Sequence, residues 1–203
     1  VRDLRGARLQ VYAAVWLCLT THALLDALTV YGTRLFWPLW PAPIGIGSVF
    51  IIDPLYTLPL LVAVVWALCL RGWTPRFRRV LAGALVLSTA YLGWSLVAQQ
   101  LALTRAGAAL ARLGTGPAPR LLATPTPFNT LLWRIIAVDG DRYLNLYVPL
   151  LGAGGSVTAY THPRGIADDG CLDAVPAGAR LARFSHGFYR LDREADAVVL
   201  SDL

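Results

Sequence analysis

The stretch Leu19–Pro41 reads LTTHALLDALTVYGTRLFWPLWP and lies at the end of the first apolar segment of the chain. It contains a histidine and an aspartate four residues apart, His22 and Asp26, which a helix would place on one face. Cys18 and Thr29 extend this polar stripe along an otherwise apolar helix. Because ionisable side chains in an apolar helix are costly without partners, we interpret His22 and Asp26 as half of a metal site that faces other helices.

A simpler interpretation of the same pair stays open. The pattern His-x-x-x-Asp is short and occurs readily by chance. A neutral His22 that hydrogen-bonds Asp26 inside a helix bundle would satisfy both side chains without any metal. The spacing alone does not separate these two interpretations.

The composition indicates a membrane-embedded first half and a soluble second half. The 203 residues are 56% hydrophobic and 15% charged, and their mean hydropathy is +0.54, whereas an average soluble domain is about 25% charged. All basic side chains are arginines, and they outnumber the acidic residues mainly before about residue 100. This distribution predicts membrane lipids as partners and argues against nucleic acid. The three cysteines form no Cys-x-x-Cys pattern, so they indicate neither a zinc knuckle nor a disulfide framework.

Three apolar segments predict about three transmembrane helices. They cover residues 10–31, 54–73 and 79–113, and the last continues beyond about residue 99 as an amphipathic stalk. The first follows three arginines, as a signal peptide would, but its apolar run is too long for a signal core and no small-x-small cleavage site follows. The second begins at Asp53-Pro54, a helix cap followed by a proline at the first helical position. Capping is compatible with metal binding, because a carboxylate has two oxygens.

The arginine-rich turn at residues 71–79 sets the predicted topology. The positive-inside rule places this turn and the N-terminus in the cytoplasm. The loop that follows the first helix, and everything after residue 114, would then lie outside. We therefore expect a multi-pass protein of the bacterial inner membrane with an extracytoplasmic C-terminal domain. His22, Asp26 and Asp53 would all lie at one face of the membrane.

Residues 115–203 predict a small antiparallel β-rich domain, so the expected fold class is an α+β membrane protein. Asp139-Gly140 is a tight-turn signal between two alternating segments, which indicates a β-hairpin. Helical spacing is expected here only in a short turn near residues 168–173. The predicted strands are residues 131–138, 142–148, 157–161, 181–190 and 197–201.

Four segments resemble a known family. THALLDALTVYGTRLFWP (residues 21–38) and FIIDPLYTLPLL (residues 50–61) resemble the YdjM-type membrane-bound metal-dependent hydrolases of bacteria. TPTPFNTLLWRIIAVDGDRY (residues 124–143) and RFSHGFYRL (residues 183–191) resemble the C-terminal part of longer family members. The resemblance covers most of the chain.

The resemblance implies a metal site. His22 and Asp26 fall on the family's His-x-x-x-Asp, and Asp53 falls on its Ile-Asp-Pro, so the resemblance implies that all three are metal ligands. Zinc suits histidine and carboxylate ligands and would activate a water molecule. The implied reaction is hydrolysis of a lipid or phosphoester at the membrane surface, with Asp53 as the carboxylate that takes the proton. Family members also carry a His-Arg-Gly-x-Thr-His motif upstream that this chain lacks, so we expect a shortened or inactive member.

Other residues are weaker candidates. His186 could complete the ligand set from a strand, although a surface or semi-buried sheet histidine is the simpler interpretation. His162, before Pro163 in a loop, is a weaker candidate still. Asn129, Trp133 and Arg134 could contact lipid headgroups or could serve packing and the surface. A non-enzymatic membrane-anchored binding or scaffold protein remains the alternative to the hydrolase. A transporter is disfavoured because the second and third helices carry no charge in their interiors.

Overall fold

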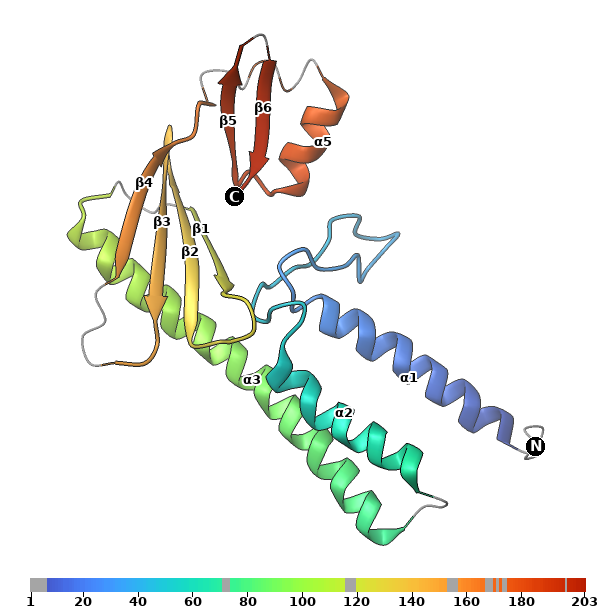
Figure 1. Ribbon diagram of the computed structural model, residues 1–203. Coiled ribbons are helices and arrows are strands. Elements are labelled where there is room, and N and C mark those ends of the chain that lie inside the picture. The colour runs from blue at the N-terminus through green and yellow to red at the C-terminus, as the bar shows by residue number, and fades with distance from the viewer. Residues whose placement is uncertain are drawn as a thin grey trace. The chain divides into compact units, whose positions relative to one another are not determined.

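The computed structural model describes residues 7–70, 74–115, 120–152, 157–166, 170, 172, 175–195 and 197–203. The chain divides into two compact units, Val1–Ser95 and Leu96–Leu203. The first unit contains α1, α2 and the first part of α3, and the second contains the rest of α3, α5 and all six strands (Figure 1). The boundary expected at residue 114, between a membrane region and a soluble region, stays a prediction.

The first helix is shorter than predicted. α1 spans Arg8–Asp26, whereas the sequence predicted a helix to residue 31. The chain turns back after α1, and the backbone N–H groups of Ile46 and Ser48 donate to the carbonyls of Ala27 and Leu28 at 2.9 and 2.8 Å. These carbonyls therefore bond the returning segment, which stops the helix.

The start of the second helix is as predicted. α2 spans Pro54–Cys69, and Oδ1 of Asp53 accepts a hydrogen bond from the N–H of Leu55 at 2.9 Å. This confirms Asp53 as the helix cap. The helix was predicted to end at residue 73, whereas α2 ends at Cys69. Residue 73 itself lies outside the described residues.

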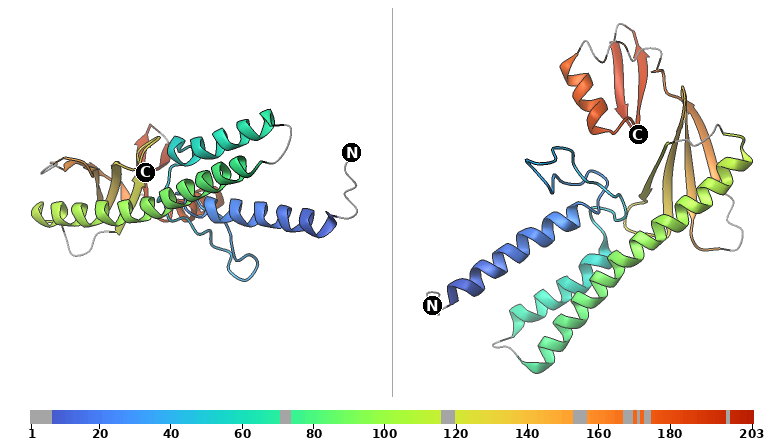
Figure 2. Two further views of the ribbon diagram at one scale, coloured as in Figure 1. Left: turned by 90° about the horizontal axis from the view of Figure 1, so that it is seen from below. Right: turned by 180° about the vertical axis from the view of Figure 1, so that it is seen from behind.

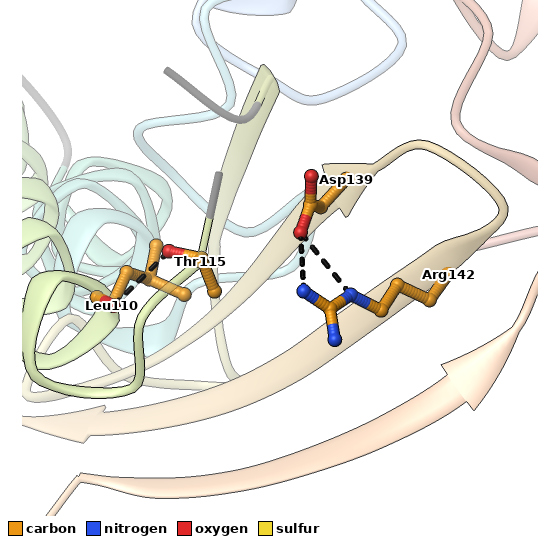
Figure 3. A network of polar contacts seen from close by, with 4 residues as sticks. All are labelled: Leu110, Thr115, Asp139 and Arg142. Atoms are coloured by element: carbon orange, nitrogen blue, oxygen red, sulfur yellow. Dashed lines mark hydrogen bonds and ion pairs between the residues drawn. The ribbon is translucent and has the colours of Figure 1, made fainter. Parts of the chain in front are cut away.

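The third helix contains the predicted stalk. α3 runs without interruption through 38 residues, Pro75–Arg112. It ends where Gly114 adopts a positive φ of 65°, a conformation that favours glycine. The hydroxyl of Thr115 donates to the carbonyl of Leu110 at 3.0 Å and satisfies one carbonyl of the last turn (Figure 3).

The prediction of three transmembrane helices is wrong. Among the described residues, only α3 is long and apolar enough to cross a membrane. α2 has 16 residues, which span about 24 Å, less than the roughly 30 Å of a bilayer's hydrocarbon core. α1 carries Thr20, Thr21, His22 and Asp26 within its last two turns. The first two apolar segments of the sequence extend further than the helices that form from them.

The second unit is built on a four-stranded antiparallel sheet. Its strands are β1 (Arg120–Pro125), β2 (Leu132–Asp139), β3 (Arg142–Pro149) and β4 (Thr158–Pro163), in the order β1-β2-β3-β4. The predicted hairpin is confirmed: Asp139 pairs with Arg142 across the turn, and their side chains form an ion pair at 2.8 Å (Figure 3). Strands near residues 157–161 and 197–201 are confirmed as β4 and β6.

One face of the sheet packs on the second half of α3 (Figure 1). Alanines recur at every fourth position of the helix and allow close approach of the sheet. The buried residues of this core include Ala98, Ala102, Ala106 and Leu110 of α3 and Trp133, Ile135, Leu146 and Val148 of β2 and β3. Alternate residues of each strand reach this face, as the period of two requires.

The C-terminal segment forms a helix and a hairpin. α5 spans Pro176–Phe184, and β5 (Tyr189–Glu194) pairs with β6 (Ala197–Asp202) (Figure 2). The strand predicted at residues 181–190 is therefore wrong over residues 181–188, and only Tyr189 and Arg190 lie in a strand. Pro176 occupies the first turn of α5, and Ala177, Leu181 and Phe184 follow at helical spacing. Most of the turn predicted near residues 168–173 lies outside the described residues.

Candidate functional site

The first unit contains a buried seam of polar side chains between α3 and the start of α2. We call it the polar seam; its members are Ser48, Asp53, Ser88, Tyr91 and Ser95. The three α3 residues are spaced three and four apart, so they share one face of the helix. Ser48, Asp53 and both α3 serines are buried. Polar groups buried in an apolar surrounding require hydrogen-bond partners.

Asp53 is the centre of this seam. Its side chain is 2% exposed. One carboxylate oxygen accepts from the N–H of Leu55 at 2.9 Å, and the other accepts from the hydroxyl of Tyr91 at 2.6 Å. Both oxygens therefore bond protein donors, one from α2 and one from α3.

The serines extend the same arrangement. The hydroxyl of Ser88 donates to the carbonyl of Tyr56 at 2.8 Å, one turn inside α2. The hydroxyl of Ser95 lies 3.3 Å from that of Ser48, in the segment that leads to α2. Each α3 member of the seam thus contacts the chain around the start of α2, and together they hold α2 against α3 (Figure 2).

His22 and Asp26 lie elsewhere, near the C-terminal end of α1. The His22 side chain is exposed and Asp26 is half-buried. Within the described part of the chain, neither side chain has a hydrogen bond or an ion pair. The hydroxyl of Thr29 bonds the backbone carbonyl of Asp26 at 2.7 Å, not its carboxylate. Cys18 is exposed and free. The side chains of Cys18, His22 and Asp26 therefore lie on α1 without bonding one another, and Thr29 lies beyond the end of the helix.

The predicted ligands are not gathered into a metal centre. Across the residues that the structure describes, no group of three or more His, Cys, Asp or Glu side chains is placed to hold a metal ion. Asp53 is also already bonded through both oxygens. In this arrangement the three residues do not fit a common metal ion, and we derive no reaction step through one. Their ligand roles stay a prediction.

The C-terminal candidates have structural contacts. Trp133 is fully buried, and its indole N–H donates to the carbonyl of Thr130 at 2.9 Å. Asn129 accepts from the N–H groups of Leu131 and Leu132 at 2.9 Å and so shapes the turn before β2. Arg134 donates to Asn145 on the sheet face away from α3. For Trp133, these contacts support a role in packing over contact with lipid headgroups.

The two remaining histidines, His162 and His186, lie in the second unit. The ring of His162, in β4, stacks on Tyr143 with 5.1 Å between ring centres. His186 was predicted on a strand, but it lies in the turn between α5 and β5, with a positive φ of 51°. Its side chain is exposed, and its backbone carbonyl accepts a hydrogen bond from Arg120. The contact that holds His186 in this turn is thus made by its backbone carbonyl and not by its imidazole.

Sequence analysis did not identify Tyr91 and Arg164. Tyr91 had a signal: it lies between two serines at helical spacing in an apolar helix. Arg164 had none, because a single arginine after a predicted strand is usually exposed. In the structure its buried guanidinium donates to the carbonyls of Gly140, Gly187 and Tyr189, each at 3.2 Å.

Comparison with known proteins identifies the family. No curated protein and no solved structure matches the chain. A family model described as YdjM inner membrane protein matches residues 2–102, about half of the chain. This region includes α1, α2, the whole polar seam and the apolar part of α3. The match confirms the family resemblance of residues 21–38 and 50–61, whereas the resemblance of residues 124–143 and 183–191 lies outside the matched region. The chain belongs to the YdjM inner membrane protein family.

Proposed function

We propose that this YdjM-family membrane protein is a membrane-anchored binding or scaffold protein. The observation that carries the proposal is the bonding of Asp53: a helix N–H and a tyrosine hydroxyl occupy its two oxygens. A carboxylate held in this way stabilises the packing of two helices. Because each oxygen already accepts a hydrogen bond, binding a metal ion or taking a proton from water would have to use its remaining lone pairs and would compete with these two bonds.

In this proposal α3 is the anchor. Its N-terminal end carries three exposed arginines, Arg76, Arg78 and Arg79, which the positive-inside rule assigns to the cytoplasm. One crossing by α3 then places the strands on the extracytoplasmic side. The test is labelling of intact cells with a membrane-impermeant thiol reagent, in a background with alanine at Cys18, Cys69 and Cys171. Tyr160→Cys should react from outside and Arg78→Cys only after lysis; the reverse pattern would invert the orientation.

The sheet offers a surface for a partner. β4 lies at one edge of the sheet, where one side of its backbone has no neighbouring strand among those described. Tyr160, in the middle of β4, is 53% exposed. An exposed edge strand with an aromatic side chain suits the addition of an extended segment of a partner protein. This surface supports a binding role for the second unit.

A metal-dependent hydrolase is the second candidate. The placement of His22 favours it, because the imidazole is exposed and has no partner in the described structure, and Asp26 lies one turn away. Such a pair is free to bind a divalent metal ion such as zinc. The substrate would be a lipid or a phosphoester at the membrane surface, as the family resemblance implies. Asp53, whose two oxygens each accept a hydrogen bond in this arrangement, would act through the fold.

Metal analysis separates the two candidates. Protein purified from membranes would be measured for zinc and other divalent metals as wild type, His22→Ala and Asp26→Ala, with Cys18→Ala as the matched control on the same helix. The scaffold proposal expects equal, substoichiometric metal in all four and no hydrolysis of phospholipid or phosphoester. A full equivalent of metal that both His22→Ala and Asp26→Ala lose, and that Cys18→Ala retains, would establish the hydrolase candidate instead.

A further inference from the structure

The first unit has an apolar groove between α2 and α3. Its volume is about 480 Å³, and every residue that lines it is apolar. Leu58, Pro59 and Val62 form the α2 side, and Val80, Gly83 and Leu87 form part of the α3 side. The volume falls in the range of small-molecule sites, roughly 300–1,000 Å³.

The groove is open because a side chain is missing from its α3 wall. Gly83 has no Cβ, and a Cβ added there would meet no atom within 4 Å. On both sides of it α3 presents larger apolar residues, Val80 and Leu87. Gly83, next to the small Ala84, is therefore a gap between the larger side chains of Val80 and Leu87, and a longer side chain at this position would enter the groove.

Charge at one end of the groove indicates what fills it. Arg76 and Arg79 lie four residues before Val80 and Gly83, so each arginine continues the helix face that lines the groove. Both side chains are exposed, and neither has an ion-pair partner among the described residues. An apolar groove that ends in free arginines on the cytoplasmic side is complementary to an acyl chain attached to an anionic headgroup.

We infer that this groove holds an acyl chain of an anionic phospholipid, whose phosphate is bound by Arg76 and Arg79. The inference rests on the proposed placement of α3 in the membrane. Within the hydrocarbon region the groove is dry, and lipid chains are the apolar molecules present at high concentration. The arginines add a preference for an anionic headgroup, because a zwitterionic headgroup brings its own positive charge.

Native mass spectrometry of the detergent-purified protein tests this inference. The probes are phosphatidylglycerol and phosphatidylcholine with identical acyl chains, offered at equal concentration. Wild type should retain one phosphatidylglycerol in preference to phosphatidylcholine. Gly83→Leu should lose phosphatidylglycerol by about tenfold or more, since displacing two buried methylene groups already corresponds to that factor. Gly93→Leu is the matched control, because Gly93 is also an exposed α3 glycine with open space around it and lies outside the groove.

Substituting the two arginines tests the headgroup preference separately from binding of the acyl chain. In Arg76→Gln/Arg79→Gln, phosphatidylglycerol and phosphatidylcholine should bind equally. Three results would overturn the inference: undiminished phosphatidylglycerol on Gly83→Leu, equal binding of the two lipids to wild type, or a wild-type dimer that Gly83→Leu converts to a monomer. Alkaline extraction of membranes distinguishes a failure of the lipid-site inference from a failure of the proposal that α3 anchors the chain in the membrane. If the chain stays in the membrane pellet but retains no lipid, the lipid site is refuted and the membrane anchor is not.

Discussion

The phenol hydroxyl of Tyr91 donates a 2.6 Å hydrogen bond to the carboxylate of Asp53, from the middle of α3 to the cap of α2. The two residues are 38 positions apart in the sequence. One carboxylate therefore serves two functions, since its second oxygen caps α2 through the N–H of Leu55. One bond caps the first turn of α2, and the other holds that end of the helix against α3.

Tyr91→Phe should lower the free energy of unfolding by about 1.5–3 kcal/mol, the range for a hydrogen bond to a charged group. The phenylalanine keeps the ring and removes only the donor, so Oδ2 of Asp53 is left without its bond from α3. Chemical denaturation of the purified protein measures the change. Tyr12→Phe, at a tyrosine that is 73% exposed, is the control and should leave stability unchanged. Equal midpoints for Tyr91→Phe and wild type would show that the bond contributes nothing.

The loop after α1 makes a second prediction. Gly32 and Gly114 both adopt φ of 65°. An added Cβ at Gly32 would lie 1.9 Å from the carbonyl oxygen of Ile44, whereas one at Gly114 would meet nothing within 4 Å. Gly114→Ala should therefore lower the free energy of unfolding only by the cost of placing alanine in the left-handed conformation, about 1–2 kcal/mol. Gly32→Ala should cost about 3 kcal/mol or more, near the upper end for single substitutions. Thermal unfolding of the two variants side by side gives the comparison, and equal losses would contradict it.

Local signals explain the features that could be predicted from sequence. Asp53-Pro54 starts α2 and Asp139-Gly140 turns the hairpin because each depends on neighbouring residues. The same reasoning overestimated the membrane helices, since an apolar segment shows which residues avoid water and does not show where the helix ends. α1 ends at Asp26 because residues from a returning loop bond the carbonyls of Ala27 and Leu28, which directly follow the helix. That contact has no signal inside the helix.

The candidate site failed to assemble for a related reason. The i, i+4 spacing of His22 and Asp26 is a local property, and both do lie on α1. Bringing Asp53 to them would need a tertiary contact, and no spacing in the sequence encodes one. The partner that Asp53 does have, Tyr91, was detectable only as part of a polar stripe with Ser88 and Ser95.

Arg164 joins the sheet to the C-terminal hairpin and makes a third prediction. Its guanidinium donates to the carbonyl of Gly140 in the turn between β2 and β3 and to the carbonyls of Gly187 and Tyr189 around the start of β5, and it lies over the ring of Tyr189. Arg164→Gln should destabilise the protein by about 2–4 kcal/mol, because three part-buried hydrogen bonds from a buried side chain are lost. Arg190→Gln is the matched control; its ion pair with Asp192 is exposed, so about 0–1 kcal/mol is expected.

Hydrogen exchange locates the effect of Arg164→Gln. The amide of Leu191 donates to the carbonyl of Arg164 at 2.7 Å, so its protection reports whether β5 stays attached to the sheet. Loss of protection at Leu191 with retained protection in β2 and β3 is the expected pattern. Uniform loss across all strands would show that Arg164 supports the whole unit and not the attachment of the hairpin.

Asp202, near the C-terminus, makes the stability of the second unit depend on pH. Partial burial raises the pKa of its carboxyl above the usual 3.8, against the opposing effects of the Leu203 N–H, Arg134 and His186. The folded state therefore holds this proton more tightly than the unfolded state. The resulting stabilisation is complete below pH 3.8 and is lost as the pH rises through the raised pKa. Asp202→Asn cannot titrate, so its stability should lack this decrease, whereas Ser201→Ala should retain it. Denaturation midpoints for the three proteins between acidic and neutral pH measure the difference; parallel curves for wild type and Asp202→Asn would show that this carboxyl does not contribute to the pH dependence.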